Sequence, residues 1–221
     1  MEFIREVFNL YVERWEFFLE LIIEHMYLTL ISVLIITIVG IITGVIMTYN
    51  DTLANVILAI TNFMYTIPSI AMFGFLVAFS GIGNTSAIIA LSIYGVLPII
   101  RNTYVGIKEV DSEIVEAAIG MGTTKKQLLL RIQLPLALPV IIAGFRTMVI
   151  MTIALGAIAS FIGAGGLGVA IWRGITTNFK ELTIAGSLLV ALLAVLADVL
   201  LNFVEHFIKR KVLGRSEGGN K

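Results

Sequence analysis

Residues 116–139 read EAAIGMGTTKKQLLLRIQLPLALP. Away from the chain ends, this is the one long stretch in which charged and polar residues gather, and apolar runs flank it on both sides. A polar loop between two membrane spans indicates a contact with something outside the membrane. We therefore interpret this stretch as the place where a partner attaches, and the rest of the chain as the membrane structure that serves it.

The composition assigns the chain to the membrane proteins. Hydrophobic residues make up 58% of its 221 residues, charged residues make up 14%, and the mean hydropathy is +1.00. Soluble domains average about 45–50% apolar and about 25% charged residues. Fifteen basic residues balance fifteen acidic ones, so no excess of positive charge points to nucleic acid. Cysteine is absent, which excludes disulfides and thiolate metal sites.

Apolar stretches of about 20 residues, long enough to cross about 30 Å of hydrocarbon, predict an all-α integral membrane protein with five spans. They cover about residues 27–47, 53–79, 85–100, 136–162 and 182–203. The second span should be broken near Pro68, because proline lacks a backbone donor and disfavours helix at the residue before it. The third span should end at Pro98. Gly40 and Gly44 are either a small-xxx-small face for close helix packing or ordinary glycines of a membrane helix.

The two ends differ from this central domain, which covers residues 27–205 and includes the polar loop at 105–135. Residues 1–26 repeat apolar side chains every three or four positions, which predicts an amphipathic helix at the membrane interface. Residues 206–221 form a basic tail. With five spans, ten lysines and arginines share the side of the polar loop and four lie opposite. The loop and the tail are therefore expected in the cytoplasm and the N-terminus outside.

The polar loop also carries a spaced motif. Its fixed positions are, in order, Glu116, Ala117, Ala118, Gly122, Ile132, Leu134 and Pro135. This pattern resembles the EAA signature of bacterial ABC importer permeases at every fixed position. A short helix that ends in glycine can dock end-on into the groove of a partner. In that interpretation the two alanines permit close approach, Glu116 sets the register and Gly122 turns the chain back.

Five further stretches resemble the osmoprotectant branch of these permeases. They are YTIPS at 65–69, LPIIRNTY at 97–104, LPLALP at 134–139, GFRT at 144–147 and ASFIGAGGLG at 159–168. The resemblance implies a MetI-like type I fold with a cytoplasmic coupling helix in a prokaryotic cell membrane. It also implies transport of glycine betaine, carnitine, choline or similar quaternary amines by alternating access, without covalent chemistry or a cofactor in this chain. The implied partners are a cytoplasmic ABC ATPase dimer that binds the ATP, a second permease copy or paralogue, and a substrate-binding protein outside.

The broken second span is a candidate for the pathway. Tyr65 and Ser69 place polar groups beside Pro68, and a freed carbonyl in a membrane needs a polar cavity or a neighbouring helix. A plain packing kink is the alternative. Quaternary amines are attracted to aromatic faces, so Tyr65, Phe73, Phe75 and Tyr94 are either transient contacts for such a solute or packing residues.

Arg146 is a charge inside a predicted span, so it should face protein or water rather than lipid. Asp198 is the acidic residue of the last span that lies deep enough to pair with it. We expect a structural or gating role for Arg146 rather than contact with a cationic solute. Asp198 either forms this pair or stabilises packing near the cytoplasmic end.

Gly163, Gly165 and Gly166 form a glycine-rich turn after the fourth span, for which we expect a re-entrant or gate-adjacent role. The G-x-G-x-x-G spacing that begins at Gly163 fits a dinucleotide fingerprint as text, but no βαβ pattern surrounds it. The chain has no P-loop motif for ATP phosphates. Its two histidines, His25 and His206, lack ligand-like spacing, so we predict no metal site.

Three alternatives to this interpretation remain. An ABC importer permease for another small solute, such as methionine, would keep the same loop. A secondary transporter would commonly show internal repeats, and we find none. An intramembrane enzyme would need a cluster of catalytic groups, which the predicted spans do not offer.

Overall fold

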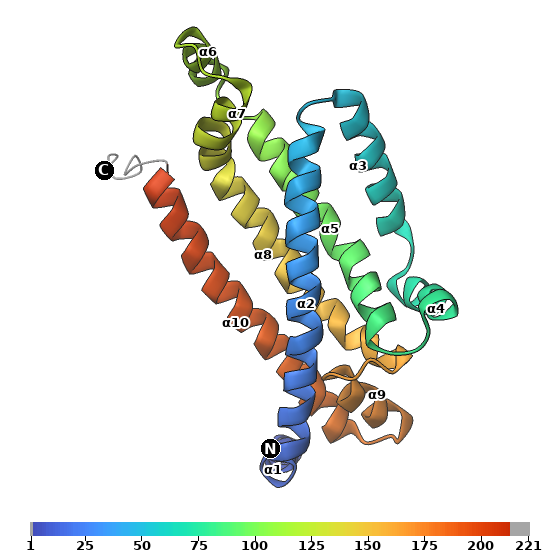
Figure 1. Ribbon diagram of the computed structural model, residues 1–221. Helices are drawn as coiled ribbons and strands as arrows, with labels where there is room; N and C mark the ends of the chain where they lie inside the picture. Colours follow the sequence, from blue (N-terminus) through green and yellow to red (C-terminus); the bar gives the residue numbers. More distant parts are fainter. Residues whose placement is uncertain (1, 213–221) are drawn as a thin grey trace.

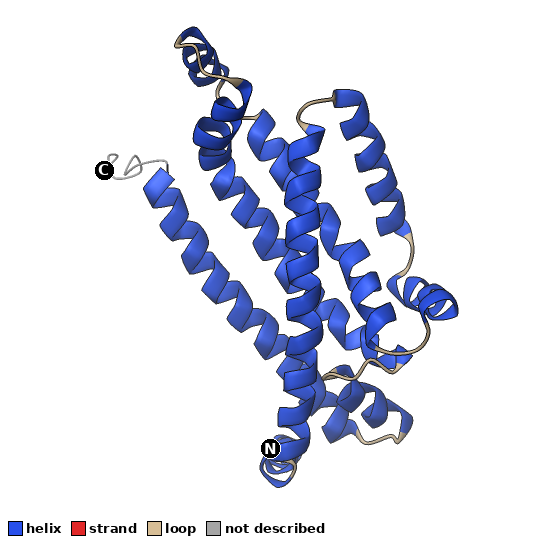
Figure 2. Cartoon of the chain, in the orientation of Figure 1, coloured by secondary structure: helices blue, strands red, loops and turns tan. Residues whose placement is uncertain are grey.

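The computed structural model describes residues 2–212, and in that range the chain forms helices without strands (Figure 2). Four helical segments are long and apolar enough to cross a membrane, and a bent pair of helices, counted as one broken span, gives a fifth candidate. The long segments are α2 (Trp15–Met47), α5 (Asn84–Lys108), α8 (Leu134–Ala159) with its flanking turns, and α10 (Lys180–Val212); the bent pair is α3 (Asp51–Thr66) with α4 (Ser69–Ser80). The predicted five spans are confirmed for the described residues.

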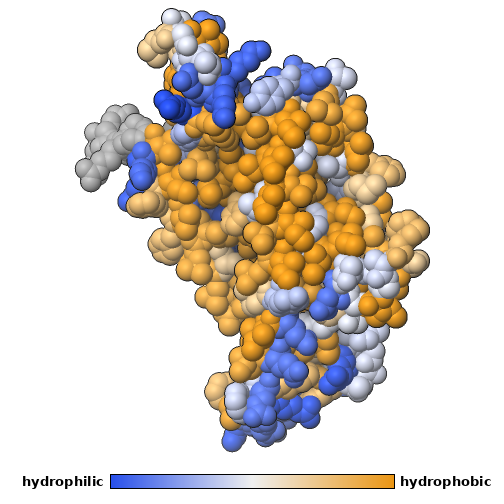
Figure 3. All heavy atoms as spheres, in the orientation of Figure 1, coloured by the Kyte–Doolittle hydropathy of each residue, from blue (hydrophilic) through white to orange (hydrophobic). Residues whose placement is uncertain are grey.

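The spans alternate in direction through the bundle (Figure 1). Helix α5 is central, because it packs against both α2 and α8, while α10 packs against α8 and α9 (Gly168–Thr176). The polar loop and the end of α10 lie toward one end of the bundle, and α1 (Glu2–Glu13) and α9 lie toward the other. On the face shown in Figure 3, apolar atoms cover the middle of the bundle and hydrophilic atoms gather at its two ends, as expected of a membrane protein.

Glycines allow α2 and α5 to pack at close range. A Cβ atom at Gly44 would lie 2.6 Å from the Thr103 Cβ, and one at Gly40 would lie 2.1 Å from a methyl group of Ile99. Real Cβ atoms do not approach this closely, so only glycine permits this distance between the helices. The small-xxx-small interpretation of these two residues is confirmed.

Helix α5 does not end at Pro98 as predicted, because it continues for ten more residues, to Lys108. The missing N–H of proline leaves a gap in the hydrogen-bond ladder, but in a membrane bundle the flanking helices can support the interrupted helix. Asn102 adds a side-chain bond, donating to the Pro98 carbonyl at 2.8 Å. At the end of the helix, Lys108 pairs with Asp51 at the start of α3, at 2.7 Å.

The amphipathic segment expected over residues 1–26 is divided in the structure. Helix α1 ends at Glu13, Arg14 leaves the helical conformation (φ −121°, ψ 35°), and α2 then runs from Trp15 through the first span without interruption. The apolar side of α1 packs on the bundle, where Val7 and Leu10 are buried with residues of α10. Tyr11 donates a hydrogen bond to the Ala185 carbonyl at 2.8 Å, which ties α1 to α10.

Candidate functional site

The polar loop begins with a short capped helix. The Asp111 side chain accepts a hydrogen bond from the Glu113 N–H at 2.9 Å and so caps α6 (Ser112–Gly120). The motif residues Glu116 and Ala117 are exposed on this helix, whereas Ala118 is 1% exposed. Ala118 therefore packs within the loop, and of the two alanines Ala117 is the one that is accessible to a partner.

Gly122 reverses the chain after α6. Its φ of +81° lies in the left-handed region that favours glycine. The turn is closed by the Thr123 N–H, which bonds the Ala118 carbonyl at 3.2 Å, and by the Thr123 hydroxyl, which donates to the same carbonyl. Thr124 then starts α7 (Lys125–Leu128) with a capping box, in which its side chain and that of Gln127 each bond the backbone of the other residue.

The loop passes directly into the fourth span. Between α7 and α8 lies one turn of π-helix, Leu129–Gln133, and Pro135 stands in the first turn of α8. Ile132 and Pro135 line a cavity of about 610 Å³ between the start of α8 and the end of α10. Leu134 is half-buried at the start of α8 and packs beside a core cluster. These three motif residues therefore join the loop to the bundle, while Glu116 and Ala117 face outward.

An exposed apolar tip on the loop was not identified from the sequence. Ile114, Ile119 and Met121 are 43%, 55% and 80% exposed, although they belong to the end of the bundle that is rich in polar residues (Figure 3). Large apolar side chains that gather on a polar segment give a surface on which another protein can pack. The signal in the sequence was Met121, which stands between two glycines where a plain turn has no need of a long apolar side chain.

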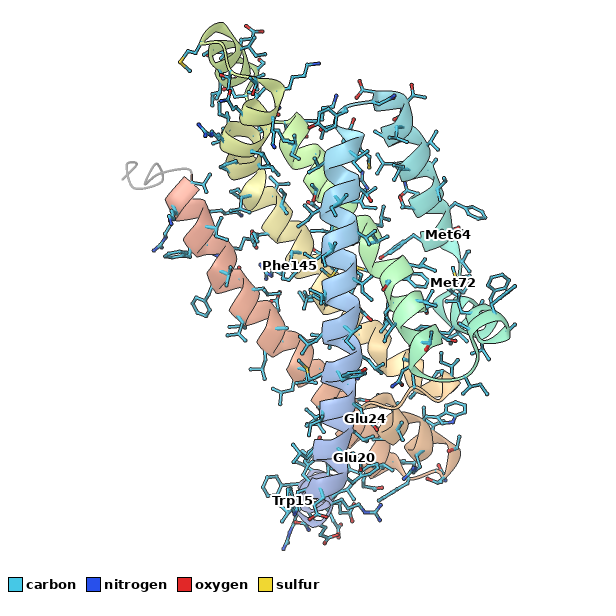
Figure 4. All side chains as sticks on the ribbon, in the orientation of Figure 1. Trp15, Glu20, Glu24, Met64, Met72 and Phe145 are labelled. Atoms are coloured by element: carbon cyan, nitrogen blue, oxygen red, sulfur yellow. The ribbon has the colours of Figure 1, made fainter. Side chains whose placement is uncertain are left out.

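The second span breaks where proline predicts it. Ile67 is extended (ψ 129°), Pro68 follows at φ −56°, and the axes of α3 and α4 differ by 99°. Figure 4 shows Met64 and Met72 on the two sides of this break. The ring of Tyr65 meets that of Tyr94 edge to face at 6.0 Å, and the Tyr94 hydroxyl donates to the Ile67 carbonyl.

The Tyr65 hydroxyl reaches the fourth span, where it donates to the Met151 sulfur at 3.4 Å. Ser69 begins α4 and is half-buried. Of the four aromatic residues considered for the pathway, Phe73 is 1% exposed and belongs to the core. Phe75 is 62% exposed and packs on Phe79 of its own helix. The structure therefore brings Tyr65 and Tyr94 together at the break and leaves the two phenylalanines apart from them.

Arg146 lies at the centre of a cluster of charged and polar groups between α8 and α10. Its Nε donates to Asp198 at 2.6 Å, and its Nη1 donates to Asn202 at 2.8 Å and to Glu205 at 3.2 Å. Lys209 bonds the other Glu205 oxygen at 2.7 Å. The predicted pairing of Arg146 with Asp198 is confirmed. Glu205 was missed because the last span was expected to end at Phe203, whereas α10 continues to Val212. Asn202 lies inside the predicted span and was missed because only acidic residues were considered as partners of Arg146.

The glycine-rich turn, at the end of the bundle opposite to the polar loop (Figure 1), is held by α2. Gly163, Gly165 and Gly166 all have positive φ, and Glu24 of α2 accepts a hydrogen bond from the Gly166 N–H at 2.9 Å. Figure 4 shows Glu24 on α2 beside this connection. The adjacent His25 is 1% exposed and bonds the Ile153 carbonyl at 3.0 Å. This histidine therefore packs α2 against α8.

The sites are spread along the bundle rather than gathered in one pocket. The loop lies at one end, the glycine turn at the other, and the proline break and the arginine cluster between them (Figure 1). No group of three metal-ligating side chains occurs within residues 2–212.

The model of one protein family matches residues 36–212, and its description is "binding-protein-dependent transport system inner membrane component". The chain belongs to this family. Its fold agrees with that assignment, because the chain resembles the inward-facing structure of the methionine ABC transporter MetNI with a TM-score of 0.76 at 22% identity. The match covers 84% of this chain and 93% of that one.

Curated relatives are similar over most of this chain. The carnitine transport permease protein OpuCB of Listeria monocytogenes is 35% identical over 96% of this chain and 94% of its own length. The glycine betaine/carnitine/choline transport system permease protein OpuCD of Bacillus subtilis (strain 168) is 38% identical over 93% of this chain and 90% of its own length.

A third relative is longer than this chain. The ergothioneine transport permease/ergothioneine binding protein EgtU of Helicobacter pylori (strain G27) is 42% identical over 80% of this chain, which spans about a third (32%) of that protein. These relatives are named as permeases. This inner membrane protein, with its five spans, is therefore a permease component of an ABC importer, the class of membrane subunit that the loop motif indicates.

Proposed function

We propose that this chain forms one side of the membrane pathway of an importer for small quaternary ammonium solutes such as glycine betaine, carnitine and choline. The observation that carries the proposal is the chemistry that the named solutes of its relatives share. Carnitine, glycine betaine, choline and ergothioneine all carry a nitrogen with three methyl groups. Methionine has no such group, and the likeness to its transporter at 22% identity concerns the fold alone.

The loop would be the docking site of a separate ABC ATPase dimer that binds the ATP. Its apolar tip at Ile119 and Met121 is exposed, and burial of this tip against a partner on the cytoplasmic side would remove apolar surface from water. Glu116 on the same helix would fix the register of that contact. In this scheme the chain itself needs no cofactor and carries out no covalent chemistry.

A second permease, identical or paralogous, would complete the pathway on the opposite side. Arg146 and Asp198 support this, because their side chains are 27% and 38% exposed in the single chain although they lie in the middle of α8 and α10. Charged groups at that depth require protein or water beside them rather than lipid. A substrate-binding protein outside would deliver the solute to the outer end of the passage.

The mechanism that follows is alternating access. Closure of the ATPase dimer would move the docked loop, and because α7 and the π-turn continue into α8, the fourth span would move with it. The loop must bind the ATPase differently in the two states, since a partner shifts an equilibrium only by its difference in affinity.

The test is uptake of radiolabelled glycine betaine into vesicles that contain this permease, its ATPase and its binding protein. We expect uptake that requires ATP and that choline and carnitine compete for, whereas methionine does not. Uptake of methionine in place of the quaternary amines would overturn the proposed substrate. Uptake that persists without the ATPase would overturn the mechanism.

A further inference from the structure

Helix α3 presents a polar face that no part of the described chain covers. Four polar side chains recur there at helical spacing and are all exposed, as is the small Ala59 among them: Thr52, Asn55, Asn62 and Thr66. A separate exposed face is fully apolar, with Leu53, Val56, Ile60 and Phe63, and Ala54 is buried toward α5. Helix α3 therefore has two different exposed faces beside its buried one. The apolar face suits contact with lipid, and the polar face does not.

The polar face needs a neighbour other than hydrocarbon. Asn62 is 11 residues into α3, about 16 Å along the helix, and so lies near the middle of a hydrocarbon core of about 30 Å. Within residues 2–212 its side chain amide has no hydrogen-bond partner, and neither has that of Asn55. A free amide at this depth is costly in lipid, and water or a polar solute would satisfy it.

Tyr65 connects this face to a matching face of α8. On the wheel of α3, Tyr65 lies between Asn62 and the buried side, and its hydroxyl contacts Met151. From Ala137 to Ser160, the exposed positions of α8 are Thr147 and Ala154, which flank Met151 on the same side of that helix. The exposed faces of α3 and α8 are therefore parts of one wall, with Tyr65 at their junction.

The Tyr65 ring is held in place and yet accessible. Its hydroxyl is bound to Met151, Tyr94 meets it edge to face, and Tyr94 is fixed by its bond to the carbonyl at the break. The side chain is still 40% exposed. A quaternary ammonium group has no N–H to donate, so an aromatic face is the natural contact for it. Side chains three positions apart on a helix are neighbours, which places the Asn62 amide beside the ring.

We propose that Asn62 and Tyr65 form a transit site for the quaternary amine inside the membrane. The trimethylated nitrogen rests on the Tyr65 ring, and the carboxylate of a betaine accepts hydrogen bonds from the Asn62 amide. This proposal rests on the proposed function and adds to it a site within the spans. The site contains no acidic side chain, so it holds the cation weakly and releases it, as a passage requires.

Thiol labelling tests the wall first, because the chain has no cysteine of its own. Single cysteines at Asn55 and Asn62, on the polar face, are compared in the assembled transporter with single cysteines at Ile60 and Phe63, on the apolar face. We expect a membrane-impermeant, charged methanethiosulfonate to react at the first pair at least about tenfold faster. Equal rates on the two faces, or no reaction on the polar face, would overturn the proposal and favour a dry contact between permeases.

Uptake measurements then test the site. For each solute, the uptake by a variant is divided by the uptake by wild type, so that the selectivity of the binding protein cancels. Tyr65→Leu should lower uptake of both glycine betaine and choline at low concentration by about 2- to 30-fold, and Tyr65→Phe should retain most of it. Asn62→Leu should lower glycine betaine uptake by about tenfold and leave choline, which has no carboxylate, nearly unchanged. Phe63→Leu is the matched control on the same helix and should behave as wild type.

These outcomes separate the inference from the proposed function. Wild-type uptake of glycine betaine with an unaffected Tyr65→Leu variant would overturn the transit site and leave the importer in place. An equal loss of both solutes in Asn62→Leu would overturn the assignment of the carboxylate. Absence of any quaternary amine uptake by wild type would instead contradict the proposed function, provided that another solute is taken up.

Discussion

Gly122 offers the sharpest test of the proposed coupling role of the polar loop. Its φ of +81° is a conformation that costs other L-residues about 1–2 kcal/mol. A Cβ added there would meet nothing within 4 Å, so this backbone strain is the whole cost inside the chain. One to two kcal/mol corresponds to about a 5- to 30-fold shift away from the native turn. We therefore expect a graded loss from Gly122→Asn, which tolerates this region, through Gly122→Ala to Gly122→Val.

The assay is solute uptake per ATP hydrolysed in vesicles that contain the complete transporter. Co-purification of the ATPase with each variant separates loss of docking from loss of coupling. Gly120 is the matched control, since it lies two residues away, has no positive φ, and also has open space around an added Cβ. Gly120→Val should therefore couple better than Gly122→Val. If the two variants couple equally, the left-handed turn is not what the loop requires and the reasoning fails.

Three further predictions concern the bundle. Arg146→Leu leaves acidic side chains in the membrane without their cation, so we expect a lower Tm in detergent and a partial recovery in Arg146→Lys; an unchanged Tm would contradict the role of the cluster. Gly44→Ala overpacks α2 against α5 and should destabilise the protein by about 1–3 kcal/mol, whereas Gly74→Ala, with open space at its Cβ, should leave the thermal unfolding curve unchanged. Glu24→Ala removes the acceptor of the Gly166 N–H and should speed hydrogen exchange in the glycine turn; equal exchange rates would show that the turn holds its shape without it.

Two prolines show where sequence reasoning succeeds and where it stops. Both Pro68 and Pro98 follow apolar runs, and each was predicted to interrupt a helix. The chain bends by 99° at Pro68, where the flanking residues are largely exposed. It continues as helix through Pro98, where Leu97 and Ile99 are buried and α5 lies between two other helices. At both places the proline removes one backbone N–H donor. Packing against neighbouring helices decides whether the helix continues past the proline.

The charged cluster shows a different limit. Asp198, Asn202 and Glu205 recur at spacings of four and three, which places them on one face of a helix, and this pattern was visible in the sequence. The apolar run ended the predicted span at Phe203, so Glu205 fell between that span and the basic tail and was not considered as a partner of Arg146. In the structure Glu205 is 7% exposed and bridges Arg146 and Lys209. An average over apolar residues cannot detect a polar face on a helix that remains inside the bundle.

In the proposed mechanism, the continuous helical run that follows the loop would carry a movement of the loop along the bundle. The helical run from Lys125 to Ile162 contains 38 residues, about 57 Å at 1.5 Å per residue, and so extends from the coupling loop to the glycine turn. Met151, which contacts Tyr65, and Arg146, which holds α10, both lie on it. A force applied at the loop would therefore reach the proline break and the last span through one packed helix. The glycine turn ends this helix, and its bond to Glu24 ties that end to α2. A helix that is held at the glycine turn and moved at the polar loop would tilt rather than slide. Tilting of α8 would change the distance between α8 and α3 beside Tyr65.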